Sequence, residues 1–148
     1  MTPDEVDAFV AGRKTLMVAS IGADGVPHLV PMWFALLGGE IGFWTYRSSQ
    51  KVVNLRRDPR LTCLLEAGEE YHELSGVSMQ GTAKILENLP EVRRIGEAIA
   101  ARYLPAPQDP TAQEAIRAGV AAQAPKRVAI IFHPHHTSSW DHRKLPGN

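Results

Sequence analysis

The sequence predicts a mainly β fold of the α+β class, an antiparallel barrel of six to seven strands with helices packed on one side. Runs of β-branched and aromatic residues are joined by short glycine-rich turns, which favours antiparallel pairing over helical crossovers. Gly76 and Gly81 interrupt a strand-like run, as expected where a bulge or bend lets a sheet curl. A chain of 148 residues supports one core, so residues 1–148 are expected to form a single domain.

The composition excludes several partners. Sixteen basic and sixteen acidic residues cancel, so no long-range field attracts nucleic acid or an anionic membrane. The N-terminus is polar and no apolar run approaches the length of a membrane span, which predicts a cytoplasmic protein. Cys63 is the sole cysteine, which excludes an internal disulfide, and its apolar neighbours predict a packed thiol.

Local signals define the first half of the chain. Thr2, Pro3 and Glu5 form a capping-box pattern for a short helix that ends at Gly12. Pro27 and Pro31 lack a ladder donor, which places their strand at an edge or a break of the sheet. The expected strands are 15–21, 28–36 and 41–46.

The residues from Ile41 to Pro59 change period from a strand to a short helix. The turn between them carries Ser48, Ser49 and Lys51. The unpaired N–H groups at the start of a helix favour an anion, so the turn is a candidate phosphate site. The alternative is a serine that caps a surface helix beside a solvated lysine.

The second half predicts two more strands over 60–66 and 71–86, and then two helices. Asn88 and Glu91 begin the first helix, and Thr111 with Glu114 suggests a capping box for a helix that ends near Ala122. Two further strands, 127–132 and 136–140, complete a meander-like succession.

Side-chain catalysis has little support in this sequence. The C-terminal histidines have poor spacing for a metal site, and no nucleophile motif or glycine-rich nucleotide loop is present. No catalytic residue is therefore assigned and no metal is expected. A cofactor that brings its own chemistry remains. The aromatic runs 31–34 and 43–45, expected on neighbouring strands, offer either a flat cofactor platform or a plain aromatic core.

The ordered set of motifs GVPHLVPMWF (25–34), FWT (43–45) and SQKVVNLRRDPR (49–60) resembles the flavin- and deazaflavin-binding split-barrel superfamily, often called pyridoxamine 5'-phosphate oxidase-like. The resemblance implies a split β-barrel homodimer with cofactor sites between the subunits. It assigns the phosphate to Ser49 and Lys51. It assigns the cofactor ring to Met32, Trp33, Trp44 and Thr45, with a contribution from Trp140.

Two departures separate the chain from vitamin B6 oxidases of this superfamily. Gln50 stands where those enzymes commonly carry an arginine, and their arginine-containing C-terminal motif is absent. The segment Tyr71–Val77, with Asn54–Arg57, is more similar to the branch that uses coenzyme F420. Arg47, Arg56 and Arg57 could meet its phosphodiester and oligoglutamate tail, or form surface ion pairs instead.

The resulting hypothesis is an oxidoreductase that uses F420 to transfer hydride to an electron-poor C=C or C=N bond of a small organic substrate. The first alternative keeps the fold and replaces F420 with FMN. The second is a protein that binds a flavin or deazaflavin without catalysis.

Overall fold

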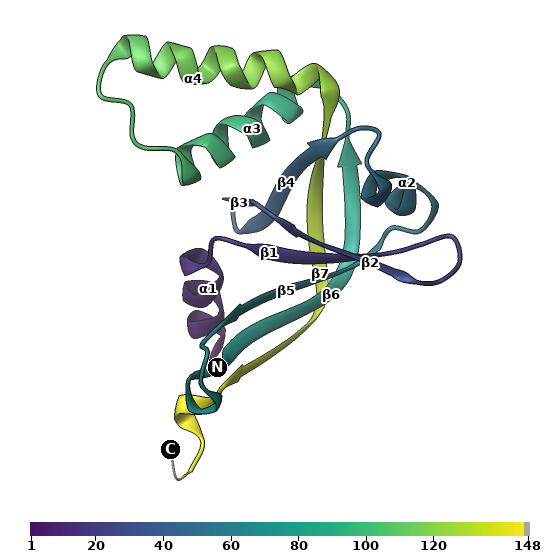
Figure 1. Cartoon of the computed structure of the whole chain (residues 1–148), viewed down its shortest axis with the longest axis vertical. Coiled ribbons are helices and arrows are strands. Elements are labelled where there is room, and N and C mark those ends of the chain that lie inside the picture. The colour runs from purple at the N-terminus through teal and green to yellow at the C-terminus, as the bar shows by residue number, and fades with distance from the viewer. Residues whose placement is uncertain (147–148) are drawn as a thin grey trace.

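The computed structural model describes residues 1–146 as one curled seven-stranded antiparallel sheet, a half-barrel with four flanking helices (Figure 1). The strands are β1 (Leu16–Ile21), β2 (Pro27–Met32), β3 (Ala35–Leu37), β4 (Glu40–Tyr46), β5 (Arg60–Ala67), β6 (Ser75–Leu86) and β7 (Arg127–Asp141). The helices are α1 (Pro3–Gly12), α2 (Gln50–Arg57), α3 (Leu89–Tyr103) and α4 (Pro110–Gln123), with short 3-10 turns at Tyr71–Glu73, Ala124–Lys126 and His142–Lys144. The predicted fold class is confirmed.

The strand order is β2-β1-β5-β6-β7-β4-β3. The prediction of a meander-like succession is therefore wrong at two places. β4 pairs with β7 rather than with β5, and β5 returns to pair with β1. Local turn signals cannot reveal such exchanges, because the pairing of distant strands is decided by the packing of the whole core.

The prolines of β2 place it as the sequence predicts, at the end of the strand order. The expected single strand 28–36 is instead broken at Trp33 and Phe34, since β3 leaves β2 and pairs with β4. Because of this break, the consecutive strands β2 and β3 lie at opposite ends of the strand order. The break thereby helps to close the curl.

β6 and β7 form the longest ladder of the sheet, with a register shift between Gln80 and Gly81. A Cβ at Gly81 would collide with the carbonyl of His133, so this close approach requires glycine. The two C-terminal strands expected from the sequence are one continuous 15-residue strand. Likewise, the N-cap of α4 is Asp109, whose side chain accepts from Ala112 N–H, and not Thr111.

Apolar side chains form two clusters on opposite faces of the sheet. The inner cluster includes Phe34, Phe43 and Phe132, and α1 packs against it through Val10. The outer cluster lies beneath α3 and includes Ile95, Ile99 and, at its margin, Trp44. Figure 1 shows α3 and α4 as a helical hairpin beside β4.

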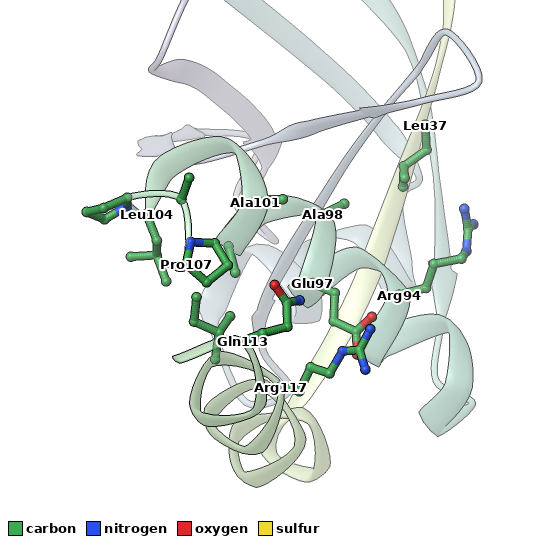
Figure 2. A pocket seen from close by; sticks show the side chains of 13 residues that line it. Leu37, Arg94, Glu97, Ala98, Ala101, Leu104, Pro107, Gln113 and Arg117 are labelled. Atoms are coloured by element: carbon green, nitrogen blue, oxygen red, sulfur yellow. The ribbon is translucent and has the colours of Figure 1, made fainter. Parts of the chain in front are cut away.

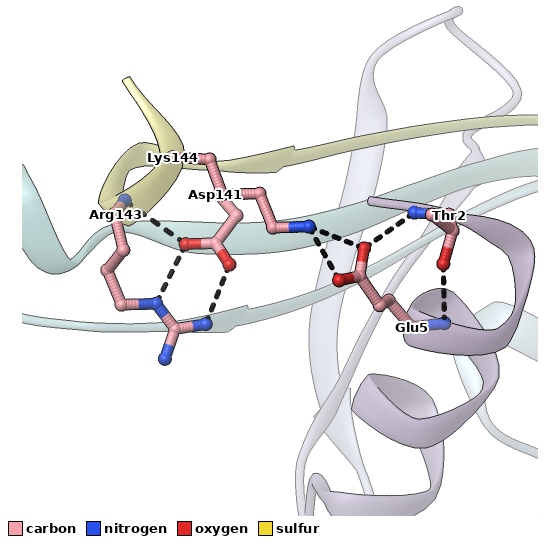
Figure 3. A network of polar contacts seen from close by, with 5 residues as sticks. All are labelled: Thr2, Glu5, Asp141, Arg143 and Lys144. Atoms are coloured by element: carbon pink, nitrogen blue, oxygen red, sulfur yellow. Dashed lines mark hydrogen bonds and ion pairs between the residues drawn. The ribbon is translucent and has the colours of Figure 1, made fainter. Parts of the chain in front are cut away.

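A polar network joins the two ends of the chain (Figure 3). Thr2 and Glu5 form the expected capping box, and Lys144 Nζ lies 2.6 Å from both carboxylate oxygens of Glu5. Beside them, Asp141 accepts two guanidinium hydrogen bonds from Arg143. None of the helices within residues 1–146 has the length and apolar character needed to cross a membrane.

Candidate functional site

The turn between β4 and α2 gathers Thr45, Ser49 and Lys51. Lys51 Nζ donates a 2.9 Å hydrogen bond to Thr45 Oγ1, which lies 3.3 Å from Ser49 Oγ. Thr45 is buried, while Ser49 and Lys51 are half-buried. We call these three residues the Lys51 cluster. The strand, turn and helix predicted from the sequence therefore bring a cation and two hydroxyl groups together.

Ser49 is the N-cap of α2, yet its side chain makes no capping hydrogen bond. Its carbonyl accepts the N–H groups of Val52 and Val53, which leaves the N–H groups of Gln50 and Lys51 without a helical partner. Ser49 therefore occupies the N-cap position, but its side chain does not cap the helix. The donors at the start of α2 and the Ser49 hydroxyl remain available to an anion.

Burial lowers the pKa of Lys51 below its ordinary value of 10.5, and the positive charge of Arg127 lowers it further. Within residues 1–146, Lys51 makes no ion pair. Two cations thus lie close enough to repel, with no carboxylate between them. An anion bound here would reduce the repulsion between the two cations and offset the cost of desolvating Lys51.

The remaining residues of the turn have different environments. Ser48 is exposed. Gln50 donates to Asn54 Oδ1 over 2.8 Å, and the buried Asn54 in turn donates to Ser20. This chain of hydrogen bonds fixes α2 against β1, so Gln50 supports the turn.

A groove with a cavity volume of about 650 Å³ lies between the α3–α4 hairpin and β4. Met32, Trp33 and Trp44, all predicted to contact the cofactor ring, line it together. Trp33 is 54% exposed and stacks on Tyr103, with ring centroids 4.4 Å apart and an interplanar angle of 10°. The structure therefore unites the predicted aromatic residues.

The sequence predicts that these residues lie on neighbouring strands, and that prediction is wrong. β2 and β4 lie far apart in the strand order, and Trp33 reaches the groove through the break before β3. Thr45 also differs from its expected role. Because successive strand residues face opposite sides, Thr45 joins the Lys51 cluster while Trp44 faces the groove.

Arg127 connects the two features, and sequence reasoning missed it. It opens β7 opposite Tyr46, and its guanidinium lies 4.6 Å from the Trp44 ring centroid and 4.2 Å from that of Tyr46. Its Nε is buried and has no hydrogen-bond partner among the described residues. A charge at the start of an apolar strand carries no signal of this position, which depends on the pairing of β4 with β7.

The three arginines expected to meet an anionic tail have partners within the chain. Arg56 pairs with Glu87 at 2.7 Å on the surface. Arg57 donates to the carbonyl of Ile21 and to Asn54. Arg47 makes one long contact of 3.4 Å with the carbonyl of Pro125. The ion-pair alternative therefore holds for Arg56.

Trp140 does not join the Lys51 cluster of its own chain. It is the penultimate residue of the 15-residue strand that Arg127 begins, so roughly 40 Å of strand separates the two. Its indole packs where a Cβ on Gly76 would stand. Trp140 therefore lies at the opposite end of β7 from Arg127, away from the Lys51 cluster of the same chain.

Cys63 is packed in the core, and His133 and His135 contact polar side chains of neighbouring strands. Burial raises the pKa of Cys63 to about 12, which is the inert thiol the sequence predicts. His133 lies 3.1 Å from Glu40, and His135 lies 3.4 Å from Thr82. Over residues 1–146, no group of three potential metal ligands is found.

A second cavity, of about 480 Å³, is lined by residues of α3 and α4 and bordered by the proline-rich connection between these helices (Figure 2). Its lining includes Arg94, Glu97 and Arg117, so charges of both signs face it. The groove beside Trp44 differs, since no acidic side chain from the described part of the chain lines it.

The residues present fit a cofactor with an anionic arm and a flat ring. Lys51, which has no ion-pair partner within residues 1–146, supplies positive charge beside the Ser49 hydroxyl, while Met32, Trp33 and Trp44 supply flat apolar surface.

Comparisons with known proteins agree with this architecture. A family model described as pyridoxamine 5'-phosphate oxidase matches residues 2–141. No curated protein is significantly similar to the chain in sequence. Among solved structures, a conserved hypothetical protein from Mycobacterium tuberculosis shares 41% identity with a TM-score of 0.88, covering 100% of this chain and 91% of that one.

More distant structures share the fold alone. One described as an F420 reductase is 19% identical with a TM-score of 0.67, covering 89% of this chain and 94% of its own. The heme storage protein HutZ from Vibrio cholerae is 16% identical with a TM-score of 0.70, covering 94% and 93%. On the family match over nearly its whole length and the relative at 41% identity, the chain belongs to the pyridoxamine 5'-phosphate oxidase family.

Proposed function

We propose that this protein is an oxidoreductase that uses the deazaflavin coenzyme F420 to reduce an electron-poor C=C or C=N bond of a small organic substrate. The observation that carries the proposal is the Lys51 cluster, a cation with no carboxylate partner among the described residues, at the free N–H groups of α2. When bound, the coenzyme supplies the hydride, and the carbon at its ring position 5 disfavours oxygen chemistry.

The chain's own residues bind and orient. Lys51 would donate to a phosphate oxygen, and the hydroxyls of Ser49 and Thr45 would replace their mutual contact with contacts to the same group. Ser48 stands at the exposed entrance of the turn, and Gln50 holds α2 in place. Met32, Trp33 and Trp44 would meet the ring at the mouth of the groove.

FMN is a second candidate because a specific observation favours it. Arg56 and Arg57 are engaged by Glu87 and by the Ile21 carbonyl, so the cations expected for a long anionic tail are partly occupied. FMN needs the Lys51 cluster but no further cations for a tail. The proposal of F420 therefore depends on two arginines. Arg47 must bind the anionic tail in place of its long contact with the Pro125 carbonyl, and the exposed Arg56 must exchange Glu87 for the tail.

Titration of the purified protein with each coenzyme, followed by quenching of tryptophan fluorescence, tests the proposal. We expect F420 to bind at least about tenfold more tightly than FMN, a difference of about 1.4 kcal/mol. FMN binding tenfold more tightly would overturn the choice of coenzyme, and binding of neither would overturn the proposal.

Turnover separates an enzyme from a binding protein. When the protein is loaded with reduced coenzyme, at least one member of a panel of enones, imines and quinones should oxidise the bound coenzyme. If no member oxidises the bound coenzyme, the protein is a non-catalytic binder of the same molecule.

A further inference from the structure

We infer that the groove between the α3–α4 hairpin and β4 binds a flat, largely apolar organic molecule that carries one carboxylate, which Arg127 holds. Its cavity volume of about 650 Å³ is in the range of small-molecule sites. The bound molecule would be the substrate of the proposed reaction. That identification rests on the proposed function, whereas the binding itself does not.

The walls of the groove select a flat molecule. On one side stand the exposed indole of Trp33, stacked on Tyr103, and the ring of Trp44. On the other side α4 presents Ala115 and Gly119, and a Cβ added to Gly119 would meet no atom within 4 Å. A groove lined by both aromatic rings and small residues suits a planar apolar body.

The charge of the groove selects an anion. Arg127 is its only ionisable lining residue within the described chain, and it makes no ion pair there. The rings of Trp44 and Tyr46 hold the guanidinium in place, and its buried Nε–H lacks an acceptor. A pre-positioned guanidinium with a free donor matches a carboxylate.

A second polar group lies on the same wall. Gln123, in the last turn of α4, lines the groove, and its amide makes no hydrogen bond with another residue of the described chain. A carboxylate bound by Arg127 would thus have an amide donor available from α4. The oxyanion would be bound where the sheet and the helical hairpin meet.

The groove is distinct from the Lys51 cluster. Trp44 and Thr45 are consecutive strand residues and face opposite sides of β4, so the phosphate donors lie on the other side of the strand from the groove. Arg127 begins β7, which pairs with β4, and therefore lies beside both the groove and the Lys51 cluster. A coenzyme ring at Met32, Trp33 and Trp44, where the proposed function places it, would cover the aromatic wall of the groove, and the second molecule would lie between that ring and α4.

Calorimetric titration of the coenzyme-free protein with 2-naphthoate tests the inference, with the neutral 2-naphthylmethanol as the matched probe. We expect saturable binding of the acid, and at least about tenfold weaker binding of the alcohol, because a charge-assisted hydrogen bond is lost. Equal affinity for acid and alcohol would overturn recognition of the anion.

Variants locate the site. Arg127→Gln should lower affinity for the acid at least about tenfold and abolish its advantage over the alcohol, while Arg127→Lys should keep part of that advantage. Gly119→Leu should fill the slot and remove binding of both probes. Ala118→Leu, at an exposed position of the same helix outside the groove, is the control and should bind like the parent. Thermal unfolding verifies that each variant folds.

Two outcomes contradict the site. Unchanged binding by a folded Gly119→Leu variant would place the probe elsewhere. Displacement of 2-naphthoate by F420 or FMN in simple competition would show that the groove is the coenzyme's own ring site. If neither coenzyme binds while naphthoate behaves as expected, the proposed function fails and the groove inference stands.

Discussion

The ammonium of Lys51 lies 2.9 Å from Thr45 Oγ1 and has no carboxylate partner within residues 1–146. The ammonium is partly desolvated, and the hydroxyl of Thr45 is its one hydrogen-bond partner among the described residues. The start of α2 and the nearby Arg127 make the position more positive still. The arrangement is what a site for an anion requires before the anion arrives.

Replacing Lys51 with alanine should weaken coenzyme binding by about 1.5 to 3 kcal/mol, since one charge-assisted hydrogen bond to phosphate is lost. Lys84→Ala, at an exposed lysine on β6, is the matched control and should bind as the parent does. Fluorescence titration measures both variants. Parental affinity in Lys51→Ala would mean that the turn does not hold the phosphate.

Coenzyme binding at alkaline pH should take up protons. The pKa of free Lys51 is lowered, so the side chain begins to lose its proton below pH 10.5, and a bound phosphate raises that pKa again. Affinity should accordingly fall as pH rises through the lowered pKa. Calorimetry in two phosphate-free buffers with different ionisation enthalpies measures the uptake.

Lys51→Arg supplies the control for proton uptake, because a guanidinium keeps its charge across this pH range. The variant should bind with no buffer-dependent enthalpy. Equal proton uptake by the parent and this variant would assign the titration to another group.

Gly96→Ala should destabilise the protein by about 1 to 3 kcal/mol through overpacking. The added Cβ would stand 2.5 Å from an atom of the Trp44 ring and 2.8 Å from Val120, so α3 must move away from β4. Gly119→Ala on α4 meets no neighbour and should instead stabilise by up to about 1 kcal/mol, through its higher helix propensity. Urea unfolding compares them, and equal effects would contradict the close contact of α3 with Trp44.

A shared site between two copies of the chain makes a prediction for mixed variants. Lys51→Ala and Trp140→Ala should each bind coenzyme weakly. If the two residues meet only across subunits, unfolding and refolding the variants together restores a fraction of full-affinity sites. No gain on mixing would contradict a site that Lys51 and Trp140 share across two subunits.

Much of this architecture was predictable from short stretches of sequence. The capping residues Thr2 and Asn88, the edge position imposed by Pro27 and Pro31, and the change from strand to helix before Lys51 are all as expected. Each depends on backbone geometry and hydrogen bonding within a few residues, so the local chain contains the information. The same holds for the proximity of Ser49 and Lys51, which one turn separates.

The tertiary structure alone decided what lies around that turn. Pairing of β4 with β7 put Arg127 over Trp44, and the break after β2 brought Trp33 to the same groove. The continuity of β7 carried Trp140 away from its own Lys51. These placements depend on which distant strands pair, and that choice minimises the energy of the whole core rather than of any local segment.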